Sequence, residues 1–82
     1  MTPPRLVAPS LSLSRNEHGL TDDQIALLQV LREEEPVLVD DLIEQTEIPT
    51  RRVLSALTVL EMENLVKQYS GKRYTRAVTL TE

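Results

Sequence analysis

The chain has almost no aromatic residues from which to build a hydrophobic core. Among its 82 residues there is no Trp and no Phe, and the two tyrosines are Tyr69 and Tyr74. A chain of this length suits one small domain with a single core. That core must therefore be aliphatic. We expect these side chains to be mostly buried: Ile25, Leu28, Leu31, Leu42, Val53, Leu57, Leu60 and Leu65.

A capping box indicates where the first helix begins. Thr21 and Gln24 are three residues apart, so each side chain can bond the backbone N–H of the other. Apolar residues then recur at helical spacing until the acidic run 33–35 and Pro36, where we expect the helix to end. Residues 37–39 follow as a short extended piece.

Two further helices are expected around a tight turn. Residues 40–46 form a short second helix, Glu47 to Pro49 form the turn, and residues 50–63 form the third helix. Asn64 can adopt the left-handed conformation that closes a helix. The two helices and their turn have the pattern of a helix-turn-helix.

A β-hairpin is expected after the third helix. Residues 65–69 and 73–76 read as strands, and Gly71 between them supplies a turn residue with positive φ. The chain is therefore predicted to be mainly α (α+β), a winged helix-turn-helix with three helices and a C-terminal β-hairpin wing.

The two ends are expected to lie outside this domain, which we place at residues 20–76. Residues 1–19 contain three prolines and read as a flexible linker or tail, although Leu11 and its apolar neighbours Leu6, Val7 and Leu13 could dock weakly. Residues 77–82 read as a C-terminal tail or an extension of the last strand. No membrane span or secretory signal is recognisable.

Charge is distributed unevenly along the chain. Residues 1–47 carry three arginines against ten acidic residues, a net charge of −7, whereas residues 48–76 carry six cations against two glutamates, a net charge of +4. The overall charge of −4 would argue against nucleic acid, but a field depends on where charges lie. The positive part coincides with the third helix and the wing.

Six cations are therefore candidate DNA contacts. Arginine in the first turn of a recognition helix reaches phosphates or base edges, and basic side chains on a wing track phosphates. The candidates are Arg51, Arg52, Lys67, Lys72, Arg73 and Arg76. The alternatives are solvated surface arginines and, on the wing, cations that protect a sheet edge from aggregation.

The outer face of the third helix is less polar than DNA recognition requires. Leu54, Val59 and Met62 lie on or beside the face opposite the core stripe and suit a protein contact better. The alternative is that neighbouring elements cover them.

Catalysis and metal binding are not indicated. His18 has no ligand partners in its pattern, and no nucleophile, base and orienting group occur at a recognisable spacing. We expect a non-enzyme with no cofactor, no metal and no small-molecule substrate. The absence of cysteine fits a reducing compartment, so we expect a cytoplasmic protein.

Residues 19–76 resemble the C-terminal winged-helix domain of the DNA processing protein A (DprA/Smf) family. The resemblance rests on Asp40 to Leu42, Ile48-Pro49, Val53 to Glu61, Leu65-Val66, and Gly71 with Tyr74. Two residues depart from the pattern, because Glu47 and Asn64 stand where many members have Gly. Both departures are tolerable if the two residues are left-handed.

The resemblance implies an accessory domain of a bacterial protein that acts in DNA uptake and natural transformation. It also implies a preceding Rossmann-like domain, so we expect a domain of a longer protein, with a natural short gene as the alternative. The expected partners are nucleic acid, bound weakly and non-specifically, and that Rossmann-like domain or a second copy. Two other functions stay open: a protein-interaction module with the same fold, and a small winged-helix transcription regulator.

Overall fold

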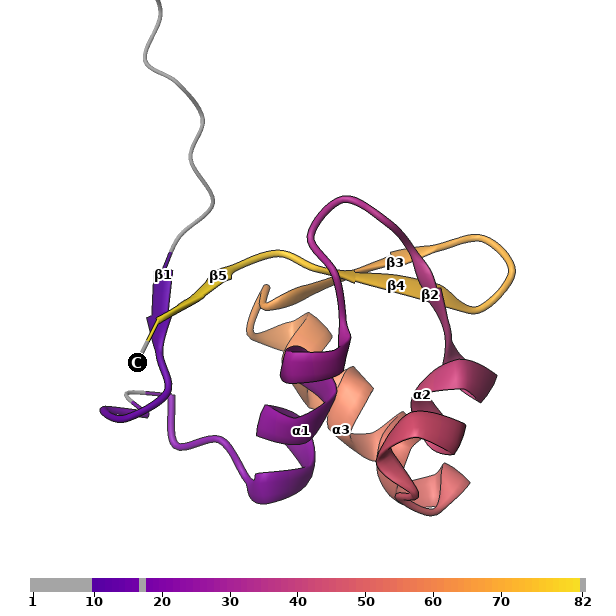
Figure 1. Ribbon diagram of the computed structural model, residues 1–82, viewed down its shortest axis with the longest axis horizontal. Coiled ribbons are helices and arrows are strands. Elements are labelled where there is room, and N and C mark those ends of the chain that lie inside the picture. Colours follow the sequence, from indigo (N-terminus) through magenta and orange to yellow (C-terminus); the bar gives the residue numbers. More distant parts are fainter. Residues whose placement is uncertain (1–9, 17, 82) are drawn as a thin grey trace, which may run out of the picture.

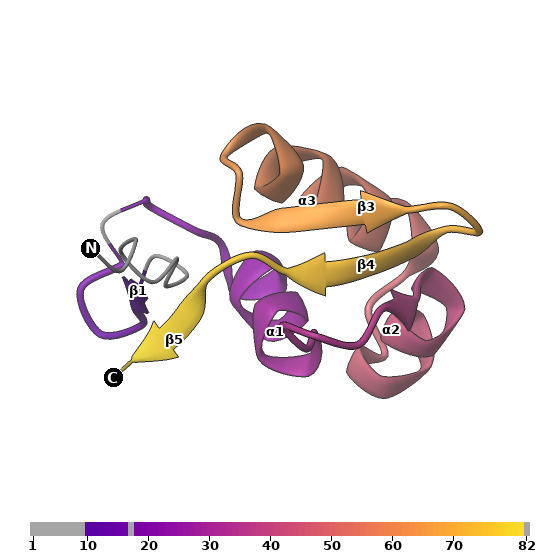
Figure 2. The ribbon, with the colours of Figure 1, turned by 90° about the horizontal axis from the view of Figure 1, so that it is seen from above.

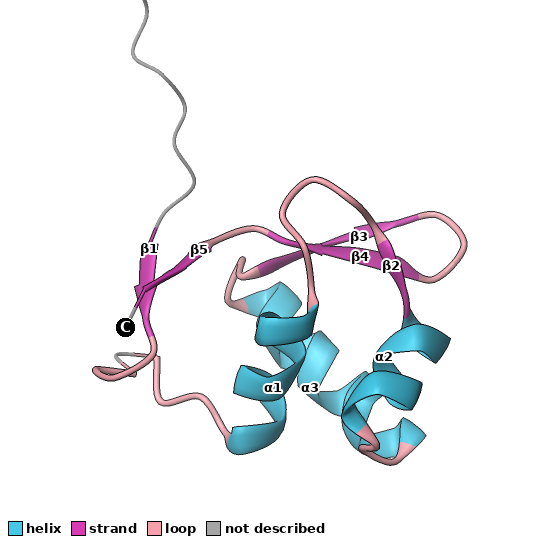
Figure 3. Cartoon of the chain, viewed as in Figure 1, coloured by secondary structure: helices cyan, strands magenta, loops and turns pink. Residues whose placement is uncertain are grey.

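The computed structural model describes residues 10–16 and 18–81. Within these residues, three helices form a layer against a three-stranded antiparallel sheet, and two further strands pair beside them (Figure 1, Figure 3). The elements in chain order are β1 (Ser10–Ser12), α1 (Asp22–Val30), β2 (Val37–Leu38), α2 (Val39–Thr46), α3 (Thr50–Met62), β3 (Val66–Tyr69), β4 (Arg73–Arg76) and β5 (Thr79–Thr81). The predicted winged helix is confirmed.

Helix α1 begins as its capping box requires. The backbone N–H of Gln24 donates to Thr21 Oγ1 over 3.3 Å, and the backbone N–H of Thr21 donates to Gln24 Oε1 over 3.0 Å. The helix ends at Val30, earlier than the acidic run that was expected to end it. Leu31 turns into an extended conformation there and stays buried.

Helices α2 and α3 form the helix-turn-helix. Glu47, which ends α2, has a φ of 57°, and Asn64, which follows α3, has a φ of 61°. Both residues are left-handed, as they must be where a family pattern has Gly. Both positions therefore adopt the conformation that makes the two departures tolerable.

The wing is part of a three-stranded sheet with the order β2-β4-β3. β3 and β4 form the predicted hairpin, with Gln68 opposite Tyr74 and Tyr69 opposite Arg73. β2 adds the third strand and pairs antiparallel with β4, which places Leu38 opposite Arg73. Seen from above, β3 runs beside α3, and the β3–β4 turn projects past the helices (Figure 2).

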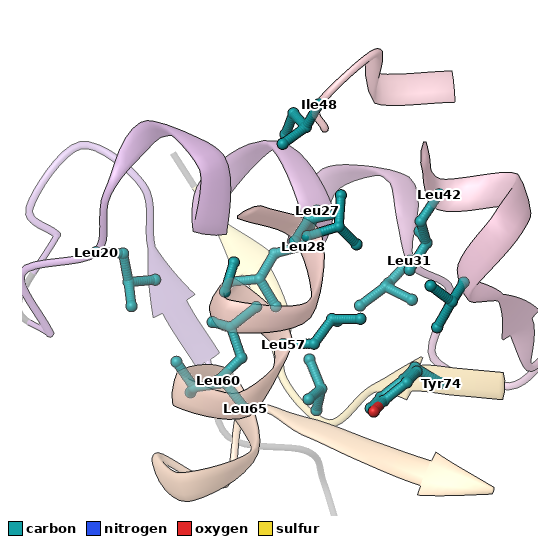
Figure 4. Close-up of a cluster of buried hydrophobic side chains, with 14 of the residues drawn as sticks. Leu20, Leu27, Leu28, Leu31, Leu42, Ile48, Leu57, Leu60, Leu65 and Tyr74 are labelled. Carbon is teal, nitrogen blue, oxygen red and sulfur yellow. The ribbon is translucent and has the colours of Figure 1, made fainter. Parts of the chain in front are cut away.

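The core is aliphatic and lies between the three helices and the sheet (Figure 4). Seven of the eight side chains expected to be buried are buried, and Ile25 is partly buried against them. Tyr74 from β4 is the one aromatic side chain in this core. The seven fully buried side chains are Leu27, Leu28, Leu31, Leu42, Val53, Leu57 and Leu60.

The ends of the described chain depart from the expected linker and tail. β1 and β5 pair in parallel, with Leu11 opposite Leu80, and Leu11 is only 4% exposed. The pair lies at the end of the molecule away from the wing turn (Figure 1). Because this pairing joins residues about seventy positions apart, no local sequence pattern predicts it. Leu6 and Val7, two of the residues that could dock weakly, lie outside the described residues.

We predict that Leu11→Ala lowers the free energy of unfolding by about 2 kcal/mol, because it leaves a cavity where β1 meets the core. Leu38→Ala is the matched control, since Leu38 is 44% exposed and its loss should cost well under half as much. Chemical denaturation of the two variants measures both losses. Equal losses would show that β1 does not contribute to the core.

Candidate nucleic-acid interface

The two arginines in the first turn of α3 have different surroundings. The Arg51 side chain is exposed and makes no hydrogen bond or ion pair with any residue the structure describes. Arg52 forms a bidentate pair with Asp23 of α1, Nε to Oδ2 over 2.8 Å and Nη2 to Oδ1 over 2.7 Å. Arg51 is therefore available to a ligand, whereas Arg52 joins α3 to α1.

The Asp23–Arg52 pair also changes the acidity of both groups. Hydrogen bonds from the Arg52 guanidinium, together with its positive charge, lower the pKa of Asp23 despite some loss of hydration. The same hydrogen bonds raise the pKa of Arg52. Both groups stay charged at neutral pH, so a phosphate would have to displace a carboxylate to reach Arg52 on the same geometry.

Three exposed cations lie on the wing. The Lys67 ammonium is 5.8 Å from the centre of the Tyr69 ring, and Lys72 lies in the turn with a φ of 58°. Arg73 Nε donates to the carbonyl of Ser70 over 3.0 Å. None of the three cations forms an ion pair within the described part of the chain, so their charges remain available.

Arg76, the sixth candidate, is committed to the fold. Its Nη1 donates to the carbonyls of Leu28 over 2.8 Å and Leu31 over 3.0 Å, and its Nε donates to the carbonyl of Val78 over 2.9 Å. Its side chain is only 16% exposed and pairs with Glu33 at 3.4 Å. Arg76 thus caps the end of α1, where the dipole favours a cation, and its guanidinium is unavailable to a phosphate.

Acidic residues lie close to the basic wing, although the two are roughly thirty positions apart in the sequence. The backbone N–H of Val39, the first residue of α2, donates to the carbonyl of Lys72 over 3.0 Å. Asp40 and Asp41 directly follow Val39 in the first turn of α2, so this acidic turn lies beside the wing turn. Their charge reduces the positive potential that the wing presents to a polyanion.

The outer face of α3 is exposed and largely apolar. Leu54 is 46% exposed, Val59 is 40% exposed and Met62 is 78% exposed, so neighbouring elements do not cover them. A shallow hollow between α1 and α3 has Val59 and Ser55 in its wall. This face offers one cation, Arg51, and little hydrogen-bonding capacity to a DNA groove.

Two further titratable side chains, Tyr74 and His18, make contacts within the fold. Tyr74 is buried, and its burial together with the charge of Glu61 raises the pKa of its phenol. His18 Nδ1 lies 3.6 Å from a carboxylate oxygen of Glu63. Among the residues described, no three His, Asp or Glu gather in a way that could hold a metal ion, and no helix is long and apolar enough to cross a membrane.

The arrangement of helix-turn-helix and wing agrees with the family whose model this chain matches. Residues 12–72 match the model of the DprA winged helix domain. The chain belongs to this family. Comparisons of this chain with curated proteins and with solved structures gave no match.

The family match leaves out parts of the structure at both ends of the chain. It spans α1, β2, α2, α3, β3 and the wing turn, but stops before β4 and leaves out β5 and most of β1. Arg76 and most of the β1–β5 pair therefore lie outside the residues of this DprA winged-helix domain that match the family model.

We predict that Arg76→Ala lowers the free energy of unfolding by about 2–3 kcal/mol, because hydrogen bonds from a charged donor to buried carbonyls are lost. Arg73→Ala on the same strand is the control and should cost under about 0.5 kcal/mol, as expected for an exposed side chain. Thermal or chemical denaturation compares the two. If the Arg73 variant is the less stable, the role given to Arg76 is wrong.

Proposed function

We propose that this DprA winged-helix domain is a non-catalytic accessory domain of a bacterial DNA-processing protein that acts in DNA uptake and natural transformation. Its working place would be the cytoplasm, where internalised DNA is handled. In this role the domain contacts DNA weakly and without sequence preference.

One observation carries the proposal. Four exposed cations lie in the first turn of α3 and on the wing, and no ion pair within the described residues neutralises them: Arg51, Lys67, Lys72 and Arg73. In winged helices these two elements face the duplex together, the helix in the major groove and the wing along the backbone. Asp40, Asp41 and the net charge of −4 oppose binding, so we expect micromolar affinity at best.

If the four cations each neutralise a phosphate, the slope of log K against log salt should be roughly −3.6 on duplex DNA. Replacing Lys72 and Arg73 together by Ala should reduce that slope to about −1.8, because two contacts are lost. Fluorescence anisotropy with labelled duplex at several salt concentrations measures it.

The matched control is Arg32→Ala. Arg32 lies in the α1–β2 loop, and its side chain is 71% exposed, pairs with Glu35 and is not one of the four candidate cations. Its removal should leave the slope near −3.6. Absence of binding even at low salt would refute the DNA contact and leave the four cations as surface residues.

The outer face of α3 supports a second candidate, a protein-interaction module that binds a second copy or the Rossmann-like domain of the parent protein. It is favoured by the exposure of Leu54, Val59 and Met62 on a helix that would otherwise be polar there. A small winged-helix transcription regulator is the third candidate, and no observation on the described residues favours it.

We predict that Leu54→Ser with Met62→Ser weakens association while the melting temperature stays within about 2 °C, because both side chains are exposed. Leu57→Ser is the contrasting variant, since Leu57 is 1% exposed and its replacement should unfold the domain at much lower temperature. Sedimentation and thermal denaturation measure the two effects. A large fall in melting temperature for the double variant would contradict an interface on this face.

A further inference from the structure

We propose that the outer face of α3 binds the same face of a second copy, with the two α3 helices antiparallel about a two-fold axis. The inference deepens the second candidate function, on which it rests, by naming the partner and its orientation. It is independent of the wing.

The middle of the face suits close helix packing. Helical spacing puts Ser55 and Thr58 opposite the core stripe, with Leu54 and Val59 on the two flanks. Two small residues at the centre let helix backbones approach, and the flanking apolar side chains then cover the contact. The Thr58 hydroxyl donates to the carbonyl of Leu54 over 2.9 Å, so burying it leaves no unpaired donor.

Opposite charges lie near the two ends of the face. Arg51 lies on the face in the first turn of α3, and Glu61 lies in the last turn at the edge of the face, next to the Leu54 flank. Both side chains are exposed, and neither forms an ion pair with a described residue. An antiparallel pair brings Arg51 of each copy beside Glu61 of the other and sets the helix dipoles head to tail. A parallel pair would instead place like charges together. The charges therefore select a second copy in the antiparallel orientation.

The size of the face sets the strength of the contact. One helix from each copy buries less than the roughly 1,200 Å² at which stable interfaces begin. The dimer is consequently weak and depends on concentration. Since Arg51 is also a proposed DNA contact, dimerisation and duplex binding compete for this residue.

A single cysteine tests which faces meet. The chain has no cysteine, so Thr58→Cys introduces one thiol close to the two-fold axis. Under mild oxidation it should form a disulfide-linked dimer whose yield rises with protein concentration. Gln45→Cys, on the exposed side of α2, is the control and should give little dimer under the same conditions.

Charge exchange tests the orientation. Arg51→Glu and Glu61→Arg should each weaken self-association roughly tenfold or more, since two symmetric contacts become repulsive. An equimolar mixture of the two variants should associate about as well as the wild type, because both contacts are attractive again in the mixed dimer. Arg32→Glu controls for the change in net charge and should leave association nearly unchanged. Sedimentation equilibrium measures all four samples.

Failure of the mixture to associate, or equal dimer yields from the two cysteine variants, would overturn the proposal. A further pair of results would also overturn it: the wild-type chain stays monomeric, and in the Thr58→Cys variant only added duplex DNA protects the introduced thiol from alkylation. Those results would assign the face to DNA. The change in salt slope on replacing Lys72 and Arg73 tests the DNA contact of the wing separately. Failure of the dimer proposal therefore leaves the DNA proposal standing, and the reverse also holds.

Discussion

The fold depends on packing leucines from three helices into one aliphatic core. Leu27 and Leu28 of α1, Leu42 of α2, and Leu57 and Leu60 of α3 are all 0–1% exposed. With so few aromatic side chains, no single residue can fill the space, so each helix must present a continuous apolar stripe. Because one stripe of α3 packs into this core, the side chains on the opposite face of the helix stay exposed.

The second constraint is that contacts within the fold hold two of the basic side chains. Of the six basic residues in the third helix and wing, Arg52 pairs with Asp23 and Arg76 caps the end of α1. Both arginines hold elements together, and a charged donor satisfies carbonyls that the end of α1 would otherwise leave unpaired. The positive surface is consequently smaller than the charge of residues 48–76 suggests, and the acidic start of α2 lies beside it.

Local signals made most of the fold predictable. The Thr21 capping box, the left-handed Glu47 and the Gly71 turn each depend on a few adjacent residues, and all three form as expected. Long-range partners were not predictable in this way. Arg52 and Asp23 are 29 positions apart, Arg76 and Leu28 are 48 apart, and β1 pairs with a strand at the other end of the chain.

The same distinction holds for the candidate site. Charge and spacing identified which residues could meet DNA, but only the tertiary contacts separate exposed Arg51, Lys67, Lys72 and Arg73 from the two committed arginines. The exposure of Met62 and its neighbours on α3 agrees with the apolar pattern, since no element within residues 10–16 and 18–81 folds over that face.

The most direct test of the central claim, that the fold divides its basic residues between structure and DNA contact, is an amide chemical-shift titration of the isotopically labelled domain with a short duplex at low salt. The claim predicts shifts that centre on the first turn of α3 and residues 67–73, with Arg76, Leu28 and Leu31 unaffected. Shifts centred on Arg76 and the end of α1, or none at all, would contradict it.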